Sequence, residues 1–212
     1  CTMAIKTDHT LWAWGYNYSG QFGNNEIGNY KDSLNRRIQT TPVKIMDDVA
    51  SVNTAFKVTM IIKTDGTLWA CGDNTYGQIG NGGSETQNTP VKIMDDVVSV
   101  STSGYHTLAI KTDGSLWAWG RNLYYELGNG KGGYTLKKYE KDDYYVQDPI
   151  CERWPVKIMD DVASVSAGDG YTMVIKNDGT LWAWGCNDVG QLGNGGEGDT
   201  VMDEFVIQAN PV

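Results

Sequence analysis

The feature that most constrains the fold is a block of sequence that occurs four times. The segment LAIKTDGSLWAWGRNLYYELGN at residues 108–129 recurs, with small edits, at 3–24, 60–81 and 173–194. Self-similarity of this kind indicates a repeat protein, in which each unit buries its apolar faces against its neighbours. We therefore expect one repeat domain over residues 1–212, with units at approximately 1–41, 42–89, 90–154 and 155–212.

Every unit has the pattern of β-strands. VASVS alternates, TLAIK is a short apolar run and LWAWG is rich in aromatic residues. TLAIK and LWAWG are separated by Asp-Gly, as at Asp113-Gly114, which is a strong hairpin signal. In the first unit His9 replaces this glycine, which predicts either a strained turn or a different turn type, because a Cβ disfavours positive φ. PVKIM predicts a fourth strand that begins at its proline.

These strands predict an all-β fold with covered sheets. Trp117 and Trp119 point to one face of their strand, whereas Leu116 and Ala118 point to the other, so both faces are apolar. Four strands per unit, stacked unit after unit, are typical of a β-propeller built of about four tandem four-stranded blades. No stretch has the helical periodicity that a helical solenoid requires.

A glycine-rich segment, G-x-N-x-x-G-Q-x-G-N, follows each LWAWG strand. In the third unit Tyr125 replaces the middle glycine and Glu126 replaces the glutamine. A phosphate-binding loop requires a following helix and usually a lysine, and the sequence has neither here. We therefore interpret this segment as turn chemistry that recurs once per blade.

The order of these segments resembles a known family. T-P-V-K-I, V-x-S-V-S, H-T-L-A-I-K-T-D-G-S-L-W-A-W-G and L-G-N-G together are similar to the regulator of chromosome condensation repeat, across essentially the whole chain. The near-identical sequences of the units resemble bacterial members of this family more than its eukaryotic nuclear member. The resemblance implies a propeller of about seven blades, so we expect four units to form an open arc or part of a larger propeller. Open blade edges also predict self-association.

Composition narrows the classes of function. The formal net charge is −9, which argues against nucleic-acid binding, and no apolar run approaches the ~20 residues of a membrane span. Cys71 stands where other units have tryptophan and is expected to be a small buried residue. For Cys151 and Cys186 the sequence leaves open either free thiols or a disulfide in an oxidising compartment.

No catalytic or metal-binding pattern stands out, so we expect no enzyme activity and no cofactor. His106 occupies a strand position and is interpreted as a packing or hydrogen-bonding residue. The Asp-Asp pairs recur in every unit, which favours turns and a solvated rim over an acid–base pair. The acidic side chains from Glu197 to Glu204 lack the spacing of a calcium loop.

The third insertion, residues 130–154, has no counterpart elsewhere in the chain. It mixes aromatic rings with charges of both signs, a composition typical of binding surfaces. The candidate partner-binding residues are Tyr134, Tyr139, Tyr144, Tyr145, Trp154, Lys137 and Lys138. The alternative is that these rings pack the insertion onto its own blade, and the sequence does not choose between the two.

These observations favour a non-enzymatic interaction or scaffold module that binds a protein or cell-surface partner through its loops, in an extracellular or cell-surface setting. The alternative implied by the resemblance is guanine nucleotide exchange on a small GTPase. That activity depends on a protruding hairpin, which cannot be mapped onto this sequence. A carbohydrate-binding surface is a third hypothesis, based on the tyrosines alone.

Overall fold

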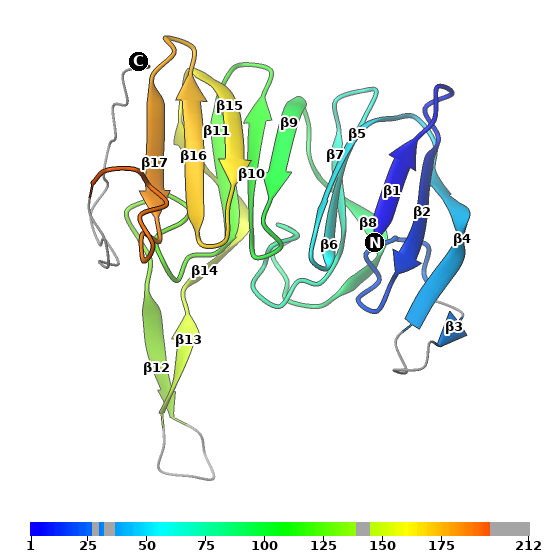
Figure 1. Ribbon diagram of the computed structural model, residues 1–212, viewed down its shortest axis with the longest axis horizontal. Helices are drawn as coiled ribbons and strands as arrows, with labels where there is room; N and C mark the ends of the chain where they lie inside the picture. Colours follow the sequence, from blue (N-terminus) through cyan, green and yellow to red (C-terminus); the bar gives the residue numbers. More distant parts are fainter. Residues whose placement is uncertain (27–29, 32–36, 139–144, 196–212) are drawn as a thin grey trace.

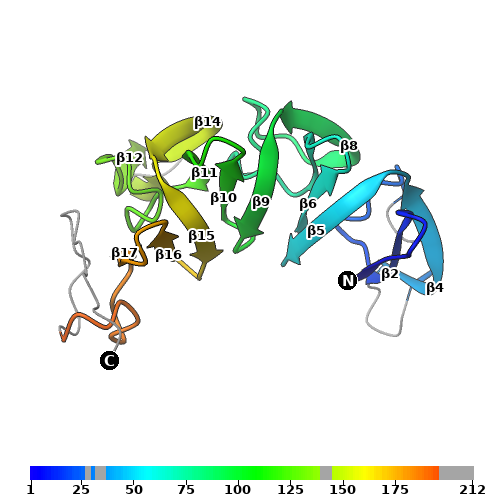
Figure 2. The same cartoon turned by 90° about the horizontal axis from the view of Figure 1, so that it is seen from above.

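The computed structural model describes residues 1–26, 30–31, 37–138 and 145–195, and this part of the chain contains strands but no helix. Four antiparallel sheets stand side by side, and we call them blades 1 to 4 (Figure 1). Seen from above, the blades follow an arc with β4, β8 and β14 on its outer side (Figure 2). The expectation of an all-β open arc is confirmed.

The blades take their strands in chain order. Blade 1 contains β1 (Thr2–Ile5), β2 (Leu11–Tyr16), β3 (Tyr30–Lys31) and β4 (Arg37–Met46); blade 2 contains β5 (Val49–Ala55), β6 (Val58–Lys63), β7 (Leu68–Gly72) and β8 (Gln87–Met94). Blade 3 contains β9 (Val97–Thr102), β10 (His106–Lys111), β11 (Leu116–Arg121) and β14 (Cys151–Met159); blade 4 contains β15 (Val162–Ala167), β16 (Tyr171–Lys176) and β17 (Leu181–Gly185). A separate hairpin consists of β12 (Tyr134–Lys138) and β13 (Tyr145–Pro149).

The Asp-Gly turns form as the sequence predicts. Gly66 has φ +79, and its N–H donates to the Lys63 carbonyl at 3.0 Å. His9 makes the same hydrogen bond to Lys6 at 3.0 Å with φ 62. The turn type is therefore kept, and the predicted strain is located at His9, because a left-handed backbone is unfavourable for a residue with a Cβ.

The PVKIM strand completes the blade that precedes it in the chain. In blade 2, β8 pairs with β7, and Val91 lies opposite Ala70. The sheets consequently divide the chain near 47–48, 95–96 and 160–161, about five residues after the unit boundaries drawn from sequence at 42, 90 and 155. The reason is that the strand pairs with LWAWG rather than with the VASVS strand that follows it.

Each apolar core lies between two blades. One core joins Val58 and Met60 of blade 2 to Ala109 and Trp119 of blade 3. The next joins Leu108 of blade 3 to its neighbours in blade 4, and a smaller one joins blades 1 and 2. The blades therefore stabilise one another, as expected for a repeat whose sheets are apolar on both faces.

Candidate interaction surface on the loop face

Each glycine-rich loop binds the next blade through one of its backbone carbonyl groups. The carbonyl oxygen of Gln78 accepts hydrogen bonds from the Thr107 hydroxyl at 3.0 Å and the Trp119 indole N–H at 2.9 Å. The Glu126 carbonyl accepts the corresponding bonds from Thr172 at 2.7 Å and Trp184 at 3.0 Å. The recurring loop is thus a junction between blades as well as a turn.

Glycine is required in this loop by the close approach of the next blade. Gly80 has φ +86, and a Cβ built on it would lie 2.6 Å from the Trp119 indole nitrogen. Gly23 faces the Cys71 sulfur in the same way. Cys71 is fully buried, as the sequence predicts, and burial raises the pKa of its thiol to about 12, so it is an inert packing residue.

Of the two departures in the third unit, Glu126 is accommodated by an arginine. Glu126 is fully buried, and its carboxylate accepts hydrogen bonds from the Arg121 Nε–H at 3.0 Å and the Tyr124 N–H at 2.7 Å. Burial raises the pKa of Glu126, while the Arg121 guanidinium acts in the opposite direction. Tyr125 takes φ 63 at the position of the missing glycine.

Arg121 also lies at the centre of an aromatic surface. Its guanidinium lies 4.3 Å from the centre of the Tyr105 ring and 5.5 Å from that of Tyr124. The centre of the Tyr105 ring lies 5.7 Å from the centre of the Phe56 ring and 6.0 Å from that of the Tyr76 ring. We call these five residues the aromatic–arginine surface. The sequence does not reveal this surface, because its members come from four separate segments of the chain.

Phe56 is the most unusual member of this surface. Its side chain is 71% exposed, and its backbone has φ 53. A bulky residue in the left-handed region is strained, and such strain concentrates at functional sites. The position corresponds to Gly104 in blade 3 and to Asp169 in blade 4, so a bulky aromatic residue at this turn is a signal that the sequence did offer.

His106 supports the turn beneath Tyr105. Its ring is fully buried between the Ser103 hydroxyl at 3.0 Å and the Thr172 hydroxyl at 3.1 Å. Because Thr172 donates its own proton to the Glu126 carbonyl, His106 must donate to Thr172 from Nε2. Burial, assisted by the Arg121 charge, lowers the pKa of His106 to about 3. The interpretation of His106 as a packing and hydrogen-bonding residue is confirmed.

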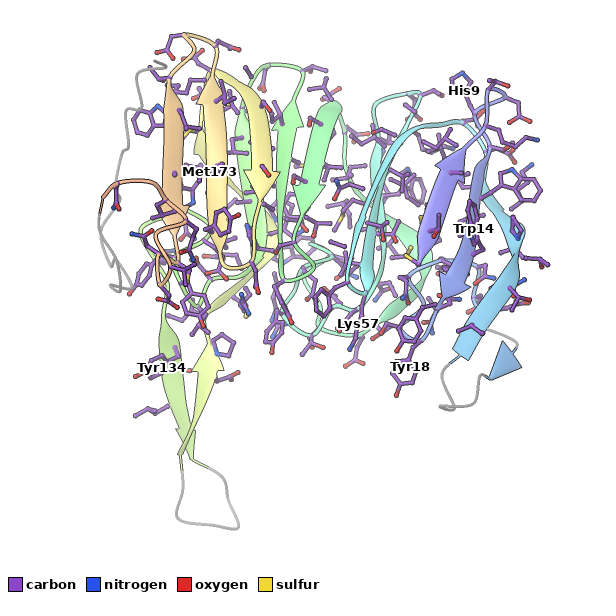
Figure 3. All side chains as sticks on the ribbon, in the orientation of Figure 1. His9, Trp14, Tyr18, Lys57, Tyr134 and Met173 are labelled. Carbon is purple, nitrogen blue, oxygen red and sulfur yellow. The ribbon has the colours of Figure 1, made fainter. Side chains whose placement is uncertain are left out.

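The β12–β13 hairpin projects from the end of the blades that carries Tyr18 and Lys57, which we call the loop face (Figures 1 and 3). Its base is fixed by backbone hydrogen bonds from Ile150 N–H to the Gly133 carbonyl and from Asn122 N–H to the Ile150 carbonyl. His9 and the Asp-Gly turns lie at the opposite end (Figure 3). The described residues of the third insertion therefore extend blade 3 as a two-stranded hairpin with a hydrogen-bonded base.

The structure separates the residues that sequence analysis grouped. Tyr134 begins the hairpin and is 48% exposed, whereas Trp154 lies in β14 and is 64% exposed. The Trp154 indole lies on Gly82 of blade 2, so this ring also packs on a neighbouring blade. The backbones of Lys137, Lys138 and Tyr145 belong to the hairpin, and Tyr139 and Tyr144 lie outside the described residues.

All four cysteines are free thiols, so Cys151 and Cys186 form no disulfide. Within the described ranges no group of three or more His, Cys, Asp or Glu side chains is arranged to hold a metal ion, and residues 197–204 fall outside those ranges. The same ranges contain no helix long and apolar enough to cross a membrane.

The repeat is recognised by a family model. The model of the regulator of chromosome condensation (RCC1) repeat matches residues 65–110, 113–175 and 178–207, more than half of the chain. A second model of the same repeat matches 97–126 and 162–191. The chain belongs to the RCC1 repeat family. Its four sheets are therefore RCC1-type propeller blades.

Solved structures agree on the fold. Human WBSCR16 matches with a TM-score of 0.68 at 19% identity, over 94% of this chain and 48% of that one. Prp20p from Saccharomyces cerevisiae matches with a TM-score of 0.73 at 20% identity, over 93% of this chain and 46% of that one. The RCC1-type chain thus spans about half the length of the structures that it matches, which is consistent with an open arc.

Proposed function

We propose that this chain is a non-enzymatic interaction module that binds a protein partner through its loop face. The observation that carries the proposal is the β12–β13 hairpin, which projects from the same face that holds the aromatic–arginine surface. Tyrosine and arginine are enriched at interface hot spots, because they offer large contact areas and bidentate hydrogen bonding. A partner displayed at a cell surface, and a bacterial setting, are part of the proposal.

The hairpin is suited to this role because its base is preorganised. Gly133 and Ile150 are joined by a backbone hydrogen bond of 2.9 Å, so β12 and β13 start from a fixed geometry. Residues beyond that base present Tyr134 and Leu136, which are 48% and 62% exposed. Preorganised contact residues bind with a smaller loss of conformational entropy than a flexible loop would.

The test is a hairpin replacement. Residues 134–149 are exchanged for Asn-Gly, a two-residue turn that can join the hydrogen-bonded Gly133 and Ile150. Partners captured from an extract of the source organism are identified by mass spectrometry, purified and titrated by calorimetry. We expect the replacement to weaken binding at least about tenfold with an unchanged melting temperature.

The matched control is Asp95→Ala, an exposed change at the Asp-Gly turn end of blade 2, which should leave the affinity unchanged. Equal affinity of the hairpin replacement and the control for every purified partner would contradict the proposal.

The second candidate is a regulator of a small GTPase that accelerates nucleotide release. The observation in its favour is the hairpin, since exchange activity in this family is implied to depend on a protruding hairpin. Prp20p has been studied for its binding properties to Gsp1p and histones, and yeast RCC1 (Prp20) has been crystallised with Kap60. A fluorescent nucleotide-release assay over a panel of small GTPases tests this candidate. Acceleration that disappears in the hairpin replacement would favour it, and no acceleration would dispose of it.

Self-association through blade edges is a further part of the proposal. The first and last blades have neighbours on one side only within the described residues. Light scattering on the 212-residue chain is expected to give a dimer if two arcs pair. A monomeric mass at all concentrations would remove this part and leave the partner-binding proposal intact.

A further inference from the structure

Blades 3 and 4 differ at one equivalent place on the loop face. The N–H of Arg121 donates to the Tyr105 carbonyl at 2.9 Å, and the N–H of Cys186 donates to the Gly170 carbonyl at 2.8 Å. The two segments therefore correspond residue for residue: Arg121 corresponds to Cys186 and Tyr105 to Gly170. By the same register, Glu126 corresponds to Gln191, whose side-chain oxygen accepts the Val189 N–H as Glu126 accepts the Tyr124 N–H.

In blade 3 this place is filled by a guanidinium group from the chain itself. Arg121 lies against the Tyr105 and Tyr124 rings and donates to the buried Glu126 carboxylate. Its Nη2 atom also lies 3.6 Å from Asp169 Oδ1 of blade 4. The surroundings thus combine aromatic faces with carboxylates, which is the environment that arginine prefers.

In blade 4 the side chains that would fill the equivalent place are small. Cysteine replaces arginine and glycine replaces tyrosine, and a cleft of about 500 Å³ lies there. Tyr124 and Tyr171 line it together with Asp169, Asp188, Cys186 and Gln191, and none of the described residues that line it is basic. The cleft therefore has aromatic walls and two carboxylates: Asp169, which it shares with Arg121 of blade 3, and Asp188 from the loop of blade 4.

We propose that this cleft binds the guanidinium group of an arginine on a protein partner. Three observations carry the inference: the repeat-equivalent place holds Arg121, the Tyr124 ring already contacts one guanidinium, and the Asp169 carboxylate faces the same group. Arginine is favoured over lysine because its planar fork binds carboxylates bidentately and stacks on aromatic rings. The inference rests on the proposed function only in that a protein partner supplies the arginine.

The experiment titrates a short probe, acetyl-Gly-Arg-Gly amide, into the full chain and follows the tyrosine side-chain NMR signals. We expect shifts at Tyr124 and Tyr171, weaker affinity at high salt, and weaker binding of the lysine analogue. Asp169→Asn and Asp188→Asn, both exposed changes, should each weaken binding by about fivefold. Asp73→Asn, a carboxylate on the loop of blade 2 that lines no part of the cleft, is the matched control.

A second variant fills the cleft from within. Cys186→Arg combined with Gln191→Glu copies the blade 3 pair and should abolish binding of the probe. Equal weakening by Asp73→Asn, equal affinity for the lysine and arginine probes, or full binding by the filled variant would each overturn the inference. If that variant does not fold, the two asparagine variants decide. The described residues that line the cleft are not part of the hairpin, so a failed titration with intact partner capture separates this inference from the proposed function.

Discussion

The junction between blades 1 and 2 and the junction between blades 2 and 3 use the same loop but different partners. At the second junction Trp119 fills the space above Gly80 and donates to the Gln78 carbonyl at 2.9 Å. At the first, Cys71 occupies the tryptophan position, and its sulfur lies 3.5 Å from the Gln21 carbonyl. The hydroxyl bond is common to both, from Thr59 to Gln21 and from Thr107 to Gln78. The threonine–carbonyl bond therefore defines the junction, and the neighbouring side chain sets how strongly it is packed.

The largest expected loss of stability comes from removing the Trp119 side chain at the second junction. Trp119→Ala removes a fully buried indole and its hydrogen bond, and should lower the free energy of unfolding by about 3–5 kcal/mol. Cys71→Ala removes one buried sulfur and should cost only about 1 kcal/mol. Urea denaturation of both variants checks the contrast. Equal losses would mean that the two junctions are packed equally well.

The third junction, between blades 3 and 4, adds a buried charge pair to the same plan. Arg121→Ala leaves the Glu126 carboxylate buried without its cation and should cost about 3 kcal/mol at pH 7. The double variant with Glu126→Gln should recover most of that loss, because glutamine stands at this position in the other blades. Thermal melting of the single and double variants measures this, and no recovery would contradict the role assigned to Arg121.

The cost of Arg121→Ala should also depend on pH. Burial raises the pKa of Glu126, so the unfolded carboxyl ionises at a lower pH than the folded one. This group therefore disfavours the folded state above its folded pKa and ceases to do so as the pH falls below its unfolded value. Removing Arg121 raises the folded pKa further. The difference in the free energy of unfolding between the parent and Arg121→Ala should thus become smaller from pH 7 to pH 4. A difference that does not change with pH would argue against a charged Glu126.

The smallest expected difference between two variants concerns two glycines with the same backbone conformation. Gly80 and Gly179 have φ +86 and +84, but a Cβ at Gly179 meets nothing within 4 Å. Gly179→Ala should therefore cost only the left-handed strain, about 1–2 kcal/mol. Gly80→Ala adds the overlap with Trp119 and should cost about 2 kcal/mol more. Similar melting temperatures for the two variants would show that the Trp119 side chain moves to make room for the added methyl group at little energetic cost.

Some of the candidate site follows from sequence and some does not. The insertion at residues 130–154 can be identified from sequence because no other unit has it. Its folding into β12 and β13 is harder to predict, because the sequence does not specify the turn length that places Leu136 opposite Gln147. The aromatic–arginine surface is beyond local reasoning. Phe56, Tyr76 and Tyr105 lie 20 and 29 residues apart along the chain, and only the stacking of blades 2 and 3 brings their rings together.

The sequence by itself determined the strands, the turns and the repeat, because these depend on the alternation of side chains and on local φ preferences such as those of Gly66 and His9. The tertiary structure decided which blade each strand completes, which carbonyl holds the next blade, and where the loop face leaves a cleft. These outcomes depend on contacts between units. The sequence shows that Cys186 stands in the fourth unit where Arg121 stands in the third. The cleft beside Cys186, however, is formed by side chains from two neighbouring blades, so only the tertiary structure defines it.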